Sequence, residues 1–598
     1  MLALLVVLLL ADGRHPDRAD ASAAAVQPTA SAASESAVAP TGDRRNVDVP
    51  DTDTHVVLRS FPDRATWEAH RARVRQQILT SAGLDPMPAR TPLNAQRFGK
   101  LERDGYTVEK VLLETWPGFY LGANLYVPAR PGRHPVVVSP HGHWNYGRLE
   151  HQPLASVPMR AANLARRGHV VLIYDMVGYN DTNQVPHSFH GAREALWAFG
   201  PLGLQLWNSL RVVDYVASLP EVDPTRIGAT GASGGATQTF LLAAVDDRIA
   251  YAAPVNMVSA YMQGGSYCEN APGLRHGISN LDIAAAFAPK PMLLMSATGD
   301  WTKHVPSEEY PAIKRIYAGL GAGDALTQAQ DDAPHNYNQQ TREAVYRFLD
   351  AQAFGKADDG KERSAPIEKL GDMLALMNRE RPANAVDYEG LFASWREMAT
   401  SQASATQDLE RLRARLRHVV ALPPASTVGR DGAGVISRGN GDRVSSAWTP
   451  GKGRPLVVVH PDGLAAGGAV AEVAAARKAK RPVLVLGVFQ TGTSVAPRNR
   501  AHDHWLTFNA SDDQARVHDI MTALAWLPAD ASAEIVATGA ARYWAAVAVA
   551  ATGGRHTLAF DVASLPSDDA TLEQQCFVPG LQRVGGMRTV QRLAQAGS

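Results

Sequence analysis

The sequence predicts an α/β protein with a doubly wound, mostly parallel sheet, followed by a second and truncated copy of the same fold. Short apolar runs alternate with segments of helical periodicity, which is typical of parallel strands joined by crossover helices. At 598 residues the chain is too long for one ordinary domain. After residue 425 the pattern of strands and helices restarts, which indicates an internal repeat.

Residues 1–45 resemble a secretory signal followed by low-complexity sequence. The apolar run Met1–Ala11 is too short to span a bilayer as a helix, which takes about 20 residues. Small residues at Ala19, Ala21 and Ala23 offer cleavage sites, although the basic segment that usually precedes the apolar run is missing. We therefore expect a secreted or periplasmic protein with no membrane span, and a cytoplasmic location is the alternative.

Residues 46–105 are expected to form a helical lead-in, with Trp67 and Ile78 on one apolar face. Residues 106–355 are expected to form the first α/β domain, which opens with a hairpin of two alternating runs around a Trp-Pro-Gly turn. The other expected strands are 134–140, 169–174, 226–230, 249–255, 292–296 and 325–330, and the expected helices are 157–167, 202–219, 237–245 and 341–354.

The second copy follows a charged, mostly helical connector over residues 356–425. Within residues 426–598, the segment Gly453–Gly463 repeats the pattern of Gly132–Gly142. The later strands and helices recur in the same order, as far as a strand-to-helix turn near residue 539. A repeat of this length is best explained as two copies of one fold.

Gly231, Ser233 and Gly235 form a G-x-S-x-G pattern between a strand and a helix. A serine on such a sharp turn adopts strained backbone, and a Cβ at either flanking position would collide with the neighbouring strand or helix. The turn lifts the hydroxyl out of the sheet above the N-terminus of the following helix. This arrangement suits a nucleophile.

A serine hydroxyl becomes a good nucleophile only when a base removes its proton and a carboxylate orients that base. Asp300 and His335 follow Ser233 in the order Ser, Asp, His, and each is expected just past the end of a strand. We assign Ser233 as nucleophile, His335 as general base and later acid, and Asp300 as the orienting residue. Asp331 and Asp332 are the alternatives to Asp300.

The negative charge that develops on the substrate oxygen requires fixed N–H donors. The backbone N–H of Gly234 is the first candidate, and the second is expected from the loop 141–144, with His143 preferred. His141 and His143 also suggest a metal pair, but no carboxylate stands beside them in the sequence. We therefore expect neither a metal nor another cofactor.

Residues that could line a substrate pocket lie on the loops around this predicted site, and ordinary packing is the alternative role for each of them. They are Trp144, Tyr179, Gln263, Glu269 and Trp301. Cys268 is expected to be a small buried residue and not a nucleophile, since no base is evident near it in the sequence. With Cys576 it makes only two cysteines, too few for a disulfide scaffold.

The first copy resembles bacterial α/β-hydrolases of the acetylxylan esterase, dienelactone hydrolase and prolyl oligopeptidase-like groups, over roughly residues 55–355. The resemblance implies an α/β-hydrolase fold and hydrolysis of an ester through an acyl-enzyme without a cofactor, and it constrains the substrate only loosely. The residues in common are Trp116–Tyr120, His141–His143, Thr230–Gln238, Thr298–Asp300 and His335.

The second copy lacks the chemistry of the first. Ala541 stands where Ser233 stands in the first copy, and Tyr543 stands where Gly235 stands. The sequence ends near where the strand bearing the acid would begin, so we expect a catalytically dead α/β-hydrolase-like domain with a structural role. A module that binds a polymeric substrate is the alternative.

The expected function is therefore that of a serine carboxylic-ester hydrolase acting on a small-molecule or polysaccharide ester, such as an acetylxylan-type substrate. Equal numbers of basic and acidic residues, 59 each, argue against nucleic acid as a partner. A serine peptidase of the prolyl oligopeptidase type is one alternative, but about 100 residues before the hairpin cannot hold the propeller domain that the resemblance implies. A non-catalytic binding protein is the other, and the complete Ser-His-Asp set argues against it.

Overall fold

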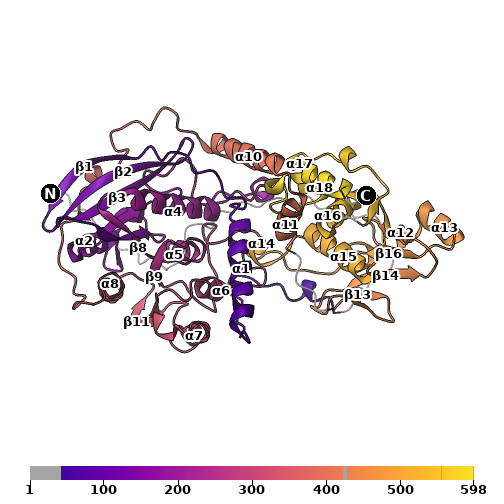
Figure 1. Cartoon of the computed structure of the whole chain (residues 1–598), viewed down its shortest axis with the longest axis horizontal. Coiled ribbons are helices and arrows are strands. Elements are labelled where there is room, and N and C mark those ends of the chain that lie inside the picture. The colour runs from indigo at the N-terminus through magenta and orange to yellow at the C-terminus, as the bar shows by residue number, and fades with distance from the viewer. Residues whose placement is uncertain (1–41, 422–426, 554, 597–598) are drawn as a thin grey trace, which may run out of the picture. The chain divides into compact units, whose positions relative to one another are not determined.

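The computed structural model describes residues 42–421, 427–553 and 555–596 (Figure 1). The predicted secretory signal lies outside these residues. Among the described helices, none has both the length and the apolar character that crossing a bilayer demands.

The first sheet has nine strands in the order β1-β2-β3-β7-β4-β8-β9-β10-β11. The strands from β1 to β7 pair antiparallel, whereas all pairs from β7 to β11 are parallel, as the sequence predicts. The strands are β1 (Gln96–Arg103), β2 (Tyr106–Trp116), β3 (Phe119–Pro128), β4 (His134–Pro140), β7 (Val170–Tyr174), β8 (Val222–Ala232), β9 (Ile249–Val255), β10 (Met292–Gly299) and β11 (Leu326–Pro334).

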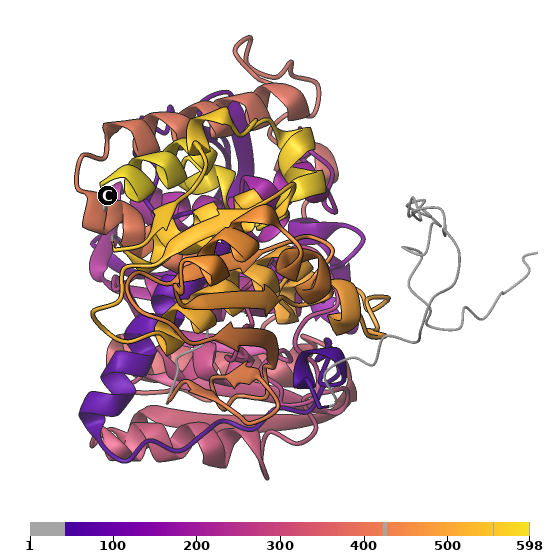
Figure 2. The same cartoon turned by 90° about the vertical axis from the view of Figure 1, so that its right-hand side faces the viewer.

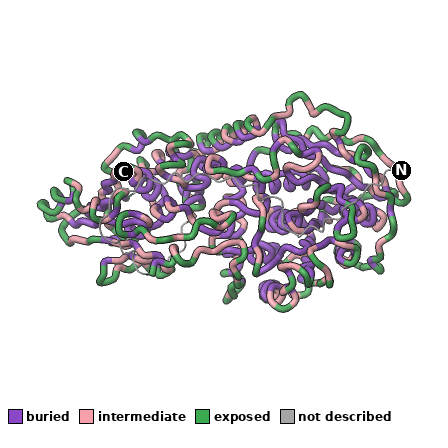
Figure 3. The backbone as a smooth tube through the Cα atoms, turned by 180° about the vertical axis from the view of Figure 1, so that it is seen from behind, coloured by how far each residue is buried: buried purple, intermediate pink, exposed green. Residues whose placement is uncertain are grey.

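Helices cover both faces of this sheet. Along β4, Val136 and Val138 pack into one hydrophobic core while Val137 packs into another, because successive side chains of a strand point to opposite faces. The interior strands β4, β7 and β8 are accordingly almost entirely buried. Figure 3 shows buried residues in purple inside the molecule and exposed ones in green at its outside. The helices are α2 (Val157–Arg167), α3 (Ala192–Leu196), α4 (Pro201–Ser218), α5 (Gly234–Val245), α6 (Asn280–Ala285), α7 (Glu309–Gly319) and α8 (Gln339–Phe354), and a short sheet pairs β5 (His151–Gln152) with β6 (Ala155–Ser156).

The lead-in is helical only in part. Helix α1 (Arg64–Ser81) buries Trp67 and Ile78, as expected. Residues 96–103, expected to be helical, instead form the edge strand β1. The register of β1 against β2 shifts between Phe98 and Leu101, and this irregularity interrupts the period of two that would have indicated a strand.

The second sheet repeats the first. Its seven strands run in the order β12-β13-β14-β16-β15-β17-β18, which matches the order from β1 to β9 strand for strand, including the swap of β7 and β4. Within the described residues the sheet has no strands that correspond to β10 and β11. Figure 2 shows this sheet in orange and yellow. Its strands are β12 (Gly429–Arg430), β13 (Val435–Ser437), β14 (Val444–Thr449), β15 (Leu456–Val459), β16 (Val483–Gly487), β17 (Glu534–Ala537) and β18 (Thr557–Leu558).

The connector is helical only in part, and it packs against the first sheet's domain. The indole ring of Trp395 stacks on that of Trp116, with their centroids 5.2 Å apart. The connector helices are α9 (Leu370–Met373), α10 (Tyr388–Ala405) and α11 (Leu409–Val420). The helices of the second copy are α12 (Leu464–Gly468), α13 (Ala471–Lys478), α14 (Trp505–Phe508), α15 (Asp512–Trp526), α16 (Ala541–Thr552), α17 (Asp569–Gln575) and α18 (Gly586–Gln595).

Candidate active site

Ser233 occupies the sharp turn between β8 and α5. Its backbone has φ 57° and ψ −126°, outside the regions that non-glycine residues usually adopt. Such a conformation costs about 1–3 kcal/mol and persists only when its surroundings enforce it. Here the N–H of Ser233 donates to the carbonyl of Val255 at 3.1 Å, which ties the turn to β9.

The glycines of this turn are required by close packing. A Cβ on Gly231 would lie 2.5 Å from the carbonyl oxygen of Gly235 and 2.6 Å from that of Pro140. A Cβ on Gly235 would lie 2.5 Å from the carbonyl oxygen of His141. These distances confirm the steric reason that the sequence pattern suggests for both glycines.

Asp300 and His335 meet at the carboxyl ends of two neighbouring strands. Asp300 directly follows β10, and His335 directly follows β11, the parallel neighbour of β10. Nδ1 of His335 lies 2.8 Å from Oδ2 of Asp300. The other carboxylate oxygen of Asp300 accepts the backbone N–H of Thr302 at 2.7 Å and its hydroxyl at 2.5 Å. The carboxylate is therefore held on both of its oxygens.

The second ring nitrogen of His335 is buried and, among the described residues, has no hydrogen-bond partner. The hydroxyl of Ser233 is therefore not bonded to it in this structure, and catalytic hydrogen bonds are often long before substrate binds. The ring of Trp301 lies 4.5 Å from that of His335, and the ring of Trp144 lies 6.3 Å from it, centroid to centroid. These two predicted pocket residues thus flank the histidine.

The two alternative carboxylates have other partners. Asp331 accepts the side-chain amide of Asn338 at 2.7 Å. Asp332 is exposed and accepts the hydroxyl of Thr298 at 2.6 Å. Asp300 is the carboxylate that contacts His335.

The loop after β4 places its two histidines in different surroundings. His141 is buried, donates from Nδ1 to the carbonyl of Gly142 at 2.7 Å and accepts the N–H of Met176 at Nε2, at 2.9 Å. Burial lowers the pKa of His141 to about 3, so its ring is neutral at physiological pH. The ring of His143 instead lies over Gly234, since a Cβ there would be 2.6 Å from its Cε1.

The N–H of Gly234 begins α5, where the first N–H groups of a helix have no partner within the helix. A helix N-terminus also favours negative charge. This N–H is therefore suited to stabilise an oxyanion, and the role of Gly234 stays a prediction. No contact of the structure tests whether the backbone N–H of His143 is the second oxyanion donor, so this role stays a prediction.

The other predicted pocket residues are engaged within the protein. The amide of Gln263 donates to the carbonyl of Ser259 and accepts the N–H of Asn280, each at 2.8 Å. Because both the oxygen and the nitrogen of its amide are occupied, Gln263 holds the chain after β9 in place. It therefore has the structural role that was the alternative to lining the pocket. Glu269 accepts the backbone N–H of Gly265 at 2.8 Å. Tyr179 packs edge-on against His141, with ring centroids 4.8 Å apart.

The turn of the second copy lacks the strained geometry of the first. Helix α16 begins at Ala541 itself, and its N-cap, Ala540, has helical backbone. The left-handed residue of this turn is Gly539, two positions before Ala541. A serine at position 541 would therefore not be presented as Ser233 is.

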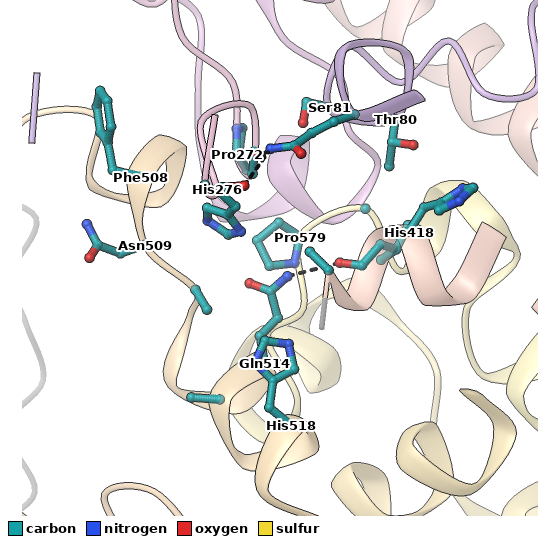
Figure 4. A pocket seen from close by; sticks show the side chains of 18 of the residues that line it. Thr80, Ser81, Pro272, His276, His418, Phe508, Asn509, Gln514, His518 and Pro579 are labelled. Atoms are coloured by element: carbon teal, nitrogen blue, oxygen red, sulfur yellow. Dashed lines mark hydrogen bonds between the residues drawn. The ribbon is translucent and has the colours of Figure 1, made fainter. Parts of the chain in front are cut away.

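Cavity size alone does not identify this site. A cavity of about 930 Å³ lies among α1, α11, α15 and the segment 272–277. Its lining includes His276, Phe508 and His518 (Figure 4), and neither Ser233 nor His335 contributes to it. The candidate site is instead located by the strained turn at Ser233 and by the contact between His335 and Asp300.

The sequence contained no sign that His187 and Cys268 lie beside His143. Nε2 of His143 lies 3.2 Å from Nε2 of His187 and 3.0 Å from Sγ of Cys268. Cys268 is buried, as expected, but a histidine does stand beside it, contrary to the basis of that prediction. Because the partners are 44 and 125 residues from His143 along the chain, only the fold brings them together.

Comparisons with known proteins concern the first copy. Residues 102–262 match the family described as Acetyl xylan esterase (AXE1). "Putative hydrolase YtaP" of Bacillus subtilis (strain 168) is 26% identical over 298 residues, which are 47% of this chain and 98% of that protein. The resemblance to acetylxylan esterases is thereby confirmed for the first copy. The first sheet and its helices form an α/β-hydrolase fold.

Solved structures include two that resemble this chain. One is Methylesterase BT1017, with 29% sequence identity, a TM-score of 0.48, and coverage of 58% of this chain and 78% of that chain. The other is the glucuronoyl esterase from Solibacter usitatus, with 16% identity, a TM-score of 0.38, and coverage of 51% of this chain and 99% of that chain.

Proposed function

We propose that this protein hydrolyses carboxylic esters through Ser233, His335 and Asp300. The observation that carries the proposal is the hydrogen bond between Nδ1 of His335 and Asp300, next to a buried Nε2 that has no partner among the described residues. With its proton on Nδ1, the ring presents a basic lone pair at Nε2. This lone pair is what the hydroxyl of a nucleophilic serine needs.

In the proposed reaction Nε2 of His335 takes the proton of Ser233 while the hydroxyl oxygen attacks the ester carbonyl. Asp300 keeps the ring oriented and stabilises the imidazolium that forms. The N–H of Gly234 stabilises the oxyanion, and a second donor comes from the loop 141–144. His335 then gives its proton to the leaving alcohol, and water releases the acyl group by the same steps.

For the substrate we propose an ester on a carbohydrate. The family description of residues 102–262 supports this class. The indole rings of Trp144 and Trp301 beside His335 support it as well, because flat aromatic faces can pack against the C–H groups of a sugar ring. Parallel assays with acetylated sugars and uronate methyl esters distinguish a neutral from an acidic sugar. Export from the cytoplasm stays a prediction.

A fluorophosphonate probe tests the proposal directly. It reacts with activated serines, so we expect labelling of the folded protein at Ser233, located by peptide mass spectrometry, and none in Ser233→Ala. Absence of labelling in folded protein would refute the proposal. Assays with acetylated sugars, uronate methyl esters and a peptide p-nitroanilide in parallel would separate an esterase from a peptidase.

A further inference from the structure

Three metal-binding side chains from separate segments converge beside the serine turn. They are His143 from the loop after β4, His187 from the segment between β7 and α3, and Cys268 from the segment after β9. One ligand atom of each lies within 4.8 Å of the others. We call this group the His-His-Cys cluster.

The spacing of the cluster is close to that of a metal site. Tetrahedral zinc binds nitrogen at about 2.0–2.1 Å and sulfur at about 2.3 Å, which places neighbouring ligand atoms about 3.3–3.6 Å apart. In the cluster, Nε2 of His143 lies 3.2 Å from Nε2 of His187 and 3.0 Å from Sγ of Cys268. The third pair, His187 and Cys268, lies within 4.8 Å, so side-chain movements would be enough to bring the three atoms to the spacing of metal ligands.

The surroundings of His187 direct a lone pair into the cluster. Its Nδ1 lies 2.6 Å from the carbonyl oxygen of Val177. Since a carbonyl only accepts, Nδ1 must carry the proton, and Nε2 of a neutral ring is then the atom able to act as a metal ligand. A backbone carbonyl that fixes the ring in this way is the usual outer partner of a metal-binding histidine.

His143 has a carboxylate behind it. Oε1 of Glu269 lies 3.9 Å from Nδ1 of His143 and favours a proton on that nitrogen. Nε2 can then act as a metal ligand too, and it lies 3.2 Å from Nε2 of His187, so that one cation can bind both nitrogens. In the other neutral tautomer of His143 the proton is on Nε2 and Nδ1 carries the lone pair. That lone pair would face the carboxylate of Glu269, which disfavours this tautomer.

We propose that His143, His187 and Cys268 bind a zinc ion. Mixed imidazole and thiolate ligands suit zinc, and the thiol proton of Cys268 passes to solvent when the metal binds. The hydroxyl of Ser266 lies 3.2 Å from both Nε2 of His143 and Sγ of Cys268, so it is close enough to contribute to the site. From the sequence we expected no metal and weighed only His141 as a partner of His143, whereas the fold brings His143 next to His187.

Such an ion would join three loops next to the serine turn, because the ring of His143 lies against Gly234. Binding to the folded state alone would raise the melting temperature. The zinc site is independent of the proposed ester hydrolysis, and its tests measure metal binding and not activity. Either proposal can therefore fail while the other holds.

Cobalt(II) substitution in Cys576→Ser tests the site. This variant retains Cys268 as its single cysteine, so any thiolate-to-cobalt charge-transfer absorption must come from Cys268. After removal of metals with a chelator, we expect this absorption to saturate at one cobalt per chain and zinc to displace it. A titration that gives no thiolate absorption would overturn the proposal.

Histidine variants test the remaining ligands. His187→Gln is expected to lose at least about tenfold in zinc affinity and most of the zinc-induced rise in melting temperature. His190→Gln, which removes an exposed histidine three residues away, should behave as the wild type does. Equal zinc responses in the two variants, or none in the wild type, would contradict a site at this cluster.

Discussion

Nδ1 of His335 lies 2.8 Å from Oδ2 of Asp300, across the carboxyl ends of the paired strands β10 and β11. The bonds from Thr302 to the other oxygen of Asp300 fix the carboxylate in place. This contact sets the tautomer of His335, and with it the availability of Nε2 as a base.

Replacement of Asp300 should therefore impair activity without unfolding the protein. In Asp300→Asn the side-chain amide can present its NH₂ to the ring and stabilise the wrong tautomer, and we expect kcat/KM for p-nitrophenyl acetate to fall about 10³–10⁴-fold. Asp332→Asn is the matched control, because Asp332 is exposed and bonds Thr298 instead. Equal losses in the two variants would refute the assignment.

Gly235→Ala should destabilise the fold. The new Cβ would lie 2.5 Å from the carbonyl oxygen of His141, where only backbone movement can relieve the contact. We expect a loss of about 1–3 kcal/mol in the free energy of unfolding, measured by urea denaturation. Gly319→Ala, at the end of α7 with open space around it, serves as the control and should be neutral or slightly stabilising. A stable Gly235→Ala protein would argue against the packing described for this turn.

A serine at position 541 should give the second copy no activity. Ala541 is buried and begins a regular helix, so a hydroxyl there would not be lifted out on a strained turn. Ser233→Ala combined with Ala541→Ser is expected to hydrolyse p-nitrophenyl acetate no faster than Ser233→Ala alone. A measurable gain would show that the second copy retains catalytic groups.

His518 should make the protein sensitive to acid. It donates to the carbonyl of Val420 at 2.7 Å, and burial lowers its pKa to about 3 from the usual 6.5. The unfolded chain binds this proton below pH 6.5 and the folded chain does not, so the stability contributed by His518 is complete above pH 6.5 and declines as the pH falls toward 3. At pH 5 the loss is about 2 kcal/mol.

The variant His518→Gln keeps a donor for Val420 but cannot be protonated in this range. We expect the fall in unfolding free energy between pH 7.5 and pH 5 to be smaller by about 2 kcal/mol than in the wild type, in urea titrations at each pH. An identical fall in both proteins would mean that His518 is charged in the folded state.

Strands and turns that depend on residues close together in the chain could be predicted from the sequence. Apolar runs located strands β2 to β11 of the first sheet within a few residues, and the repeat of Gly132–Gly142 at Gly453–Gly463 anticipated strand β15 of the second. Strand β1 could not be predicted in this way, because its irregular register interrupts the alternation of side chains on which the prediction depends.

By itself, the sequence determined the strained turn at Ser233, since its glycines and flanking elements lie within a few residues of one another. It also determined the order in which Asp300 and His335 follow. Only the tertiary structure decided that Asp300 contacts His335 and that His187 and Cys268 meet His143. The physical reason is the strand order β7-β4-β8-β9-β10-β11, which brings loops distant in the chain together at the carboxyl ends of these parallel strands.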